Sequence, residues 1–149
     1  MPERETIERA REDAREGKSP STQAGEFVRE EMHHIREGKH GAASTKQAIA
    51  IGLSKARRAG VELGPPGSGK TSASTREKAG RDYERGQSHS RKKSSTRSRA
   101  TSQALKKEGH SAASHSSLSR QARSAAQKRG SASRRNAARK ASRTRKANR

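Results

Sequence analysis

The chain of 149 residues contains no cysteine and no tryptophan, and it has one phenylalanine and one tyrosine. Without cysteine there is no disulfide framework, thiolate metal site or cysteine nucleophile. With only two aromatic side chains there is no stacking platform for unpaired bases, which argues against sequence-specific recognition of single-stranded RNA. Any nucleic-acid contacts are therefore expected to be made to backbone phosphates.

Apolar residues are also scarce. Hydrophobic residues make up 25% of the chain and charged residues 34%, and the mean hydropathy is −1.34. Such a composition supplies too little apolar surface for a large core, so most of the chain is expected to be disordered alone. No run approaches the roughly 18 apolar residues of a membrane span, and the first residues lack a signal-peptide apolar region. We therefore expect a soluble, cytoplasmic protein.

Charge is distributed very unevenly along the chain. Residues 1–63 carry 12 Lys/Arg and 11 Asp/Glu, whereas residues 64–149 carry 24 and 4, which is +20 of the net +21. A long stretch of one charge sign attracts polyanions, and a basic stretch with few aromatics is typical of nucleic-acid-binding tails.

Helical patterns occupy the first sixty residues. Residues 3–16 repeat apolar side chains at helical spacing before Gly17, and a second stripe runs through residues 24–35 before Gly38. A third helix is predicted from the Ser44/Thr45 cap to Gly60. We predict an all-α fold with a two- or three-helix module over residues 1–63. Its core is small, and self-association would stabilise it, because such cores supply only about 3–5 kcal/mol.

The remainder is low in complexity. Residues 64–86 are interpreted as a Gly/Pro/Ser linker with a short polar helix, and residues 87–149 as a Ser/Ala/Arg-rich basic tail. Ala-rich patches favour transient helices there, and on a helix one basic stripe would contain Arg135, Arg139, Arg143 and Lys146. The tail is predicted to be largely disordered and to fold on binding.

The candidate nucleic-acid contacts are the cations that end the third helix and those of the tail. They are Lys55, Arg57, Arg58, Arg91, Lys92, Lys93, Arg97, Arg99, Lys106, Lys107, Arg120, Arg123, Lys128, Arg129, Arg134, Arg135, Arg139, Lys140, Arg143, Arg145 and Lys146.

Residues 64–71 match the phosphate-binding loop pattern G-x-x-x-x-G-K-[ST]. A P-loop follows a buried strand and opens a helix, whereas the residues before this loop end a helix, and no Walker-B pattern follows. The match is interpreted as a linker. Nucleotide or phosphate binding by Gly69, Lys70 and Thr71 is the alternative.

Neither catalysis nor a cofactor is predicted. No serine lies on a strand-turn-helix elbow, and the six histidines are interpreted as solvated, so we expect no metal site and no enzyme activity.

Residues 38–60 read GKHGAASTKQAIAIGLSKARRAG. This segment resembles a family of short, basic bacterial proteins that form a domain of unknown function, and the likeness covers about the first 63 residues. The resemblance implies a bacterial source and a small helical fold, without an assigned activity. Tails in that group are also similar to bacterial histone-H1-like proteins, although this tail is richer in Arg and Ser.

Together these patterns predict non-sequence-specific binding of DNA, or of structured RNA, in a nucleoid-associated, histone-like role. A hydrophilin-like stress-protection protein is the alternative from another class, because high Gly and strong hydrophilicity suit it equally.

Overall fold

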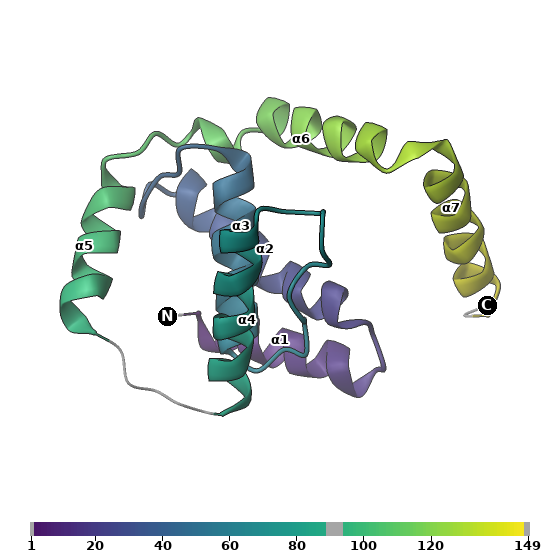
Figure 1. Ribbon diagram of the computed structural model, residues 1–149, viewed down its shortest axis with the longest axis horizontal. Coiled ribbons are helices and arrows are strands. Elements are labelled where there is room, and N and C mark those ends of the chain that lie inside the picture. The colour runs from purple at the N-terminus through teal and green to yellow at the C-terminus, as the bar shows by residue number, and fades with distance from the viewer. Residues whose placement is uncertain (1, 89–93, 148–149) are drawn as a thin grey trace. The chain divides into compact units, whose positions relative to one another are not determined.

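The computed structural model describes residues 2–88 and 94–147, and its regular elements within these ranges are all helical (Figure 1). The elements are α1 (Arg4–Arg15), α2 (Pro20–Arg36), α3 (Thr45–Arg58), α4 (Ala73–Gln87), α5 (Ser95–Lys106), the 3₁₀ helix η1 (Ser111–Ala113), α6 (His115–Lys128) and α7 (Gly130–Ala147). The chain divides into an N-terminal unit, Met1–Ser114, and a C-terminal unit, His115–Arg149.

Local signals set the ends of the first three helices. Pro20 occupies the first turn of α2, where its fixed φ suits the helix and its missing N–H is not needed. Gly38 ends the same helix with φ +74°, a left-handed conformation that glycine adopts without strain. Ser44 caps α3 by accepting a hydrogen bond from the Gln47 amide, and the Gln47 side chain accepts one from the Ala43 amide.

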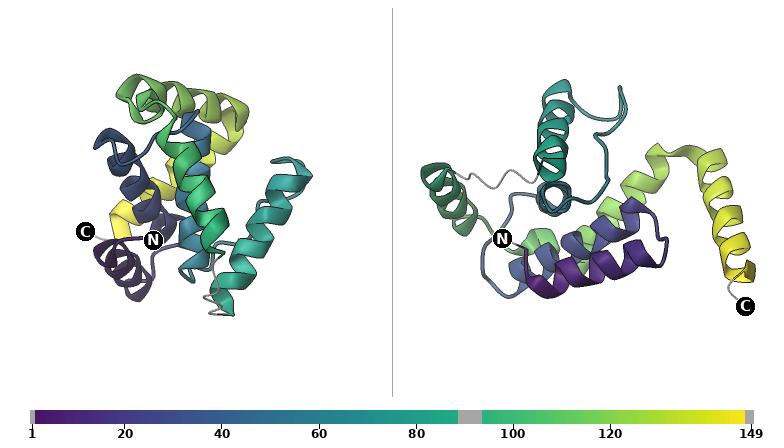
Figure 2. Two further views of the ribbon diagram at one scale, coloured as in Figure 1. Left: turned by 90° about the vertical axis from the view of Figure 1, so that its left-hand side faces the viewer. Right: turned by 90° about the horizontal axis from the view of Figure 1, so that it is seen from below.

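Helices α1 and α2 lie side by side (Figure 2), and α2 also packs on α3. Their contact surface is made of small residues around one aromatic ring, with Phe27 surrounded by Ala10, Ala24, Ala56 and Val61. Alanines let the helices approach closely, so a core with few large side chains still excludes water.

Helices α2 and α3 approach each other closely at Gly52 of α3. A Cβ atom there would lie 2.7 Å from Val28 Cα and 2.9 Å from Val28 Cγ2. Because backbone atoms of α2 occupy that space, only glycine fits without moving the two helices apart.

We expect Gly52→Ala to lower the free energy of unfolding by about 1–3 kcal/mol, because overpacking costs more than the gain in helix propensity. Gly80→Ala in α4 is the matched control, since nothing lies within 4 Å of its Cβ position. The control should be neutral or stabilising by up to about 1 kcal/mol. Urea unfolding measures both, and equal stabilities of the two variants would contradict the close approach.

The N-terminal unit extends well past residue 63. Residues 105–114, which we call the docking segment, are tied to the second and third helices and the loop between them. The contacts are Gly41 N to Leu105 O at 2.9 Å, Ala42 N to Gly109 O at 3.1 Å, Arg36 Nε to Ala113 O at 2.9 Å and Thr45 Oγ1 to Ala112 O at 2.7 Å. Ala112 and Ala113 are buried. The docking segment thus completes the unit.

Helix α4 also belongs to this unit. It packs on α3, Ala79 is buried, and a Cβ at Gly86 would lie 1.9 Å from Arg57 O. Of the predicted linker over residues 64–86, only residues 64–72 are outside a helix.

The prediction of a largely disordered basic tail is wrong. The described tail residues form α5, η1, α6 and α7, although every side chain of α7 is exposed. Composition misled because it reports whether a segment can bury a core, whereas the Ala, Arg and Lys residues of these segments have high intrinsic helix propensity, which does not require a core.

Candidate functional site

The three cations predicted as contacts at the end of α3 are used inside the N-terminal unit. Arg57 is buried and donates from Nε to Leu63 O at 3.0 Å, and burial lowers the pKa of its guanidinium. Arg58 Nε lies 2.9 Å from Asp82 Oδ1, which joins α3 to α4. Lys55 faces α2. These contacts stabilise the fold, and they leave Arg57 and Lys55 largely shielded from solvent, whereas the Arg58 side chain stays exposed beside Asp82.

Lys55 reaches two buried glutamates of α2. Its Nζ lies 2.6 Å from Glu31 Oε2 and 3.6 Å from Glu30 Oε1, and both carboxylates are almost fully shielded from water. Sequence reasoning missed this cluster. The signal was present, because Phe27, Glu31 and Ile35 are spaced four residues apart and therefore share the apolar face of the helix.

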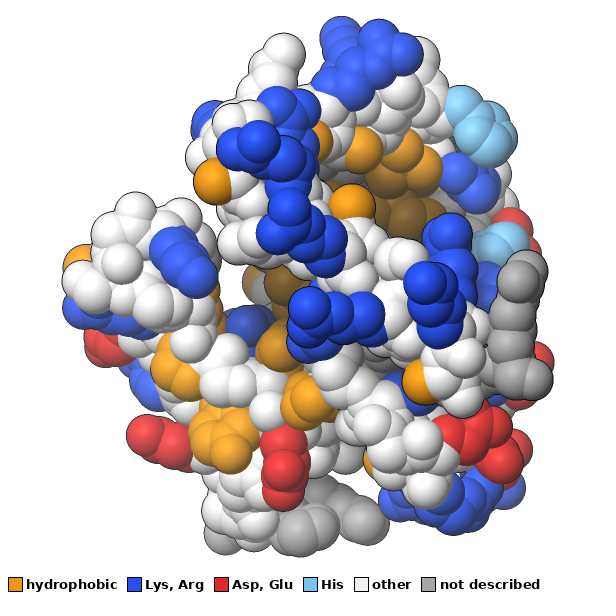
Figure 3. Space-filling view, turned by 90° about the vertical axis from the view of Figure 1, so that its right-hand side faces the viewer, with side chains coloured by type: hydrophobic (Ala, Val, Ile, Leu, Met, Phe, Trp, Pro, Cys, Tyr) orange, Lys and Arg blue, Asp and Glu red, His pale blue; other side chains and the backbone are white. Residues whose placement is uncertain are grey.

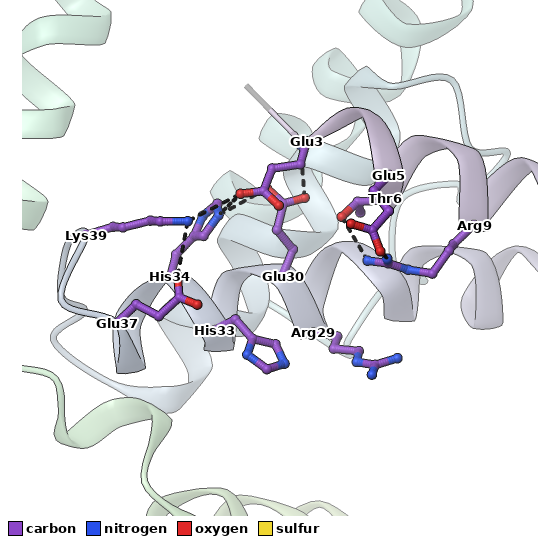
Figure 4. Close-up of a pocket in the computed structure, with 10 residues that line it drawn as sticks. All are labelled: Glu3, Glu5, Thr6, Arg9, Arg29, Glu30, His33, His34, Glu37 and Lys39. Carbon is purple, nitrogen blue, oxygen red and sulfur yellow. Dashed lines mark hydrogen bonds and ion pairs between the residues drawn. The ribbon is translucent and has the colours of Figure 1, made fainter.

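A pocket of about 250 Å³ opens beside this cluster, between the start of α1 and α2 (Figure 4). Glu3 Oε1 lies 2.9 Å from His34 Nε2 and 3.3 Å from Lys39 Nζ. The hydrogen bond from His34, followed by that from Lys39, holds the pKa of the Glu3 carboxyl below its usual value. The lining mixes both charge signs: Glu3, Glu5, Thr6, Arg9, Arg29, Glu30, His33, His34, Glu37 and Lys39. Arg9 and Lys39 in this lining already pair with carboxylates, so the pocket does not present a surface of one charge sign to an anion.

The histidines do not all behave as solvated side chains. His33 is exposed, and Figure 4 shows it directed away from the contact between Glu3 and His34. The side chains of His34 and His40 are only 12% and 16% exposed. The fold brings them to Glu31, with ligand-type atoms within 4.8 Å of one another. The fold therefore brings together three side chains that could hold a metal ion, a grouping that was not predicted from the sequence.

The P-loop-like residues lie in an exposed loop. Gly69, with φ +76°, Lys70 and Thr71 precede α4. The described residues contain no strand before them, and the Ser72 hydroxyl already accepts a hydrogen bond from the Thr75 amide at the start of the helix. The strand-loop-helix context of a P-loop is missing from this part of the chain.

The tail cations, in contrast, are exposed. This holds for Arg97, Arg99, Lys106, Lys107, Arg120, Arg123, Lys128, Arg129, Arg134, Arg135, Arg139, Lys140, Arg143, Arg145 and Lys146. Arg91, Lys92 and Lys93 lie outside the described residues. In the face shown in Figure 3, Lys and Arg side chains are more frequent than acidic ones.

None of the helices in the described ranges is long and apolar enough to cross a membrane. Comparisons of the chain with protein-family models, with curated proteins and with solved structures gave no match, so its function has to be inferred from its own charge and geometry.

Proposed function

We propose that the protein binds nucleic acid, DNA in the first place, without sequence specificity, through the cations of α6 and α7. One observation carries the proposal. The C-terminal unit has twelve Lys/Arg and no Asp or Glu, and all of its described cations are exposed. A surface with cations and no internal counter-charge binds phosphates by releasing their condensed counterions.

The arrangement on α7 supports this proposal. At about 100° per residue, Arg135, Arg139, Arg143 and Lys146 fall within an arc of roughly 80° along one side of a helix about 27 Å long. Like charges at this spacing repel one another by a few tenths of a kcal/mol per pair. Phosphates relieve that repulsion, and arginine forks can bind two phosphate oxygens at once.

Readout of bases is not expected. The single phenylalanine, Phe27, is buried in the core, and the single tyrosine, Tyr83, lies on α4 of the N-terminal unit. The exposed cations therefore have no aromatic partners for stacking on bases. Equal affinity for unrelated duplexes, as in a nucleoid-associated or histone-like protein of bacterial cytoplasm, is the role we propose. Structured RNA presents the same phosphates and would compete.

The stripe can be tested with two triple variants of equal charge. Arg135→Gln/Arg139→Gln/Arg143→Gln removes three of the four cations of the stripe, and Arg134→Gln/Lys140→Gln/Arg145→Gln removes the three cations on the other sides of α7. Glutamine preserves helix propensity. We expect the first variant to lower the slope of log affinity against log salt by about 3 and the second by less than about 1. Fluorescence anisotropy with duplexes of unrelated sequence across a salt series measures both slopes.

If both variants lower the salt slope equally, the cations of the stripe have no special role, and binding depends only on the total charge of α7. A wild-type chain that shows no binding at low salt, or a strong preference among the duplexes, would end the proposal of non-specific nucleic-acid binding. Protection of client enzymes in the absence of nucleic acid would then favour the stress-protection function.

A further inference from the structure

We propose that Glu31, His34 and His40 of the N-terminal unit bind a divalent transition-metal ion of the Zn²⁺ class. This inference is independent of nucleic-acid binding, because it concerns another unit. Glu31 and His34 lie three residues apart on one face of α2, and His40 enters from the loop between α2 and α3. Their ligand-type atoms all lie within 4.8 Å of one another.

The hydrogen bond of His40 selects the nitrogen that faces Glu31. His40 Nδ1 lies 3.1 Å from Gly41 O, and because a carbonyl oxygen only accepts, Nδ1 must donate. In the neutral ring, Nε2 then carries a lone pair, and it lies 3.2 Å from Glu31 Oε1, which also only accepts. Two acceptors at this distance repel each other unless a cation or proton lies between them. A ring nitrogen bound to a backbone carbonyl is also the usual support of a metal-ligating histidine.

The spacing of this pair fits a bound ion. Zinc bonds to histidine nitrogen and carboxylate oxygen are about 2.0–2.2 Å long, so neighbouring ligands of a tetrahedral ion are about 3.3–3.5 Å apart. The observed 3.2 Å between His40 Nε2 and Glu31 Oε1 is close to that value. The ring of His34 lies edge-on to that of His40, with centroids 6.1 Å apart. His34 is thus close enough to act as the third ligand, because its ligand-type atom lies within 4.8 Å of those of Glu31 and His40.

Glu31 provides the second, independent observation. Its side chain is 0% exposed, and neither carboxylate oxygen has a hydrogen-bond partner among the described residues. Lys55 Nζ approaches Oε2 at 2.6 Å without hydrogen-bond alignment, so Oε1 remains on the histidine side. A buried carboxylate needs compensation for its lost hydration. Lys55 supplies one positive charge to two buried carboxylates, Glu30 and Glu31, and a metal ion at Glu31 Oε1 would offset the remaining negative charge.

Two histidines and one carboxylate leave a fourth position for water or for another oxygen. Glu3 is the nearest further carboxylate, with Oε1 at 2.9 Å from His34 Nε2 (Figure 4). It orients the His34 ring in the way that carboxylates support ligating histidines. An ion held here would join α2 to the loop that leads into α3.

The full chain, treated with a chelator and desalted, is titrated with Co²⁺ and Zn²⁺ at pH 7.5. We expect one ion per chain, with the visible d–d bands of four-coordinate Co²⁺ that added Zn²⁺ removes. Zinc should also raise the Tm, because it binds the folded state. These wild-type measurements do not depend on any variant folding. Absence of both the bands and calorimetric Zn²⁺ binding at micromolar concentration would overturn the proposal.

His34→Gln and His40→Gln should each weaken Zn²⁺ binding at least tenfold, whereas His33→Gln, the exposed neighbour, should leave it unchanged. Far-UV circular dichroism verifies that each variant is folded. An equal loss in His33→Gln would indicate adventitious binding by surface histidines and would overturn the assignment. So would unchanged affinity in the folded His34 and His40 variants.

Discussion

Lys55→Met is expected to lower the free energy of unfolding of the N-terminal unit by about 3–5 kcal/mol, the usual cost of leaving a buried charge without its partner. Lys55 is the lysine that reaches both Glu30 and Glu31, with Nζ 2.6 Å from Glu31 Oε2. Methionine keeps most of the side-chain volume and removes the ammonium group. Since domains of this size have stabilities of only about 5–15 kcal/mol, the effect would be large in urea unfolding followed by circular dichroism.

Lys46→Met is the matched control, because Lys46 lies on the same helix and is exposed. It should change stability by less than about 0.5 kcal/mol. The double variant Glu31→Gln/Lys55→Met should recover part of the loss, since an amide tolerates burial better than an unpaired carboxylate. Equal stabilities of Lys55→Met and Lys46→Met would show that Lys55 does not compensate the buried glutamates.

A chain that ends at Ser114 is expected to lose at least 100-fold in affinity for duplex DNA at about 100 mM salt. The truncation removes twelve of the net +21 charges and leaves +9. If six of those twelve cations meet phosphates, the slope of log affinity against log salt falls by about 5. The chain is cut at Ser114 because a shorter fragment would also lose the docking segment that completes the N-terminal unit.

A control first verifies that the fragment is folded. Its unfolding transition, followed by circular dichroism, should match that of the full chain, apart from a smaller helical signal because α6 and α7 are absent. An affinity and a salt slope that match those of the full chain would place the nucleic-acid contacts on the N-terminal unit instead. Binding that is lost in the fragment but unaffected by the stripe variant of α7 would assign the contacts to α6.

The sequence predicted best the features that depend only on neighbouring residues, such as the starts and ends of helices. Ser44 and Pro20 mark helix starts, and Gly38 and Gly60, with φ +74° and +95°, mark ends, because capping and left-handed turns depend on a few neighbouring residues. The basic stripe on α7 also depends only on residues within one segment. Its geometry follows from spacing alone once the segment is helical.

Long-range contacts left little trace in the sequence. The docking segment is a short polar and small-residue stretch, and its burial depends on partners 67 and 77 residues away. Glu31 looked like one charge among many, although its position between Phe27 and Ile35 placed it on the apolar face. Lys55 and Arg58 were read as ligands for phosphate because their carboxylate partners come from other helices. The composition of the chain does not reveal which charged side chains of different helices pair with one another.

The docking segment also sets the order in which the chain can fold. Residues 1–63 contain the core contacts that join α1, α2 and α3, but Thr45 and Arg36 find their carbonyl partners only when residues 112 and 113 have been synthesised. Closing so long a loop is entropically costly and slow compared with pairing neighbouring helices. We therefore expect the three helices to associate early in synthesis, before the docking segment is in place. Because only four hydrogen bonds and two buried alanines are described between it and the rest of the unit, we expect the same segment to detach in partial unfolding events that leave the three helices together.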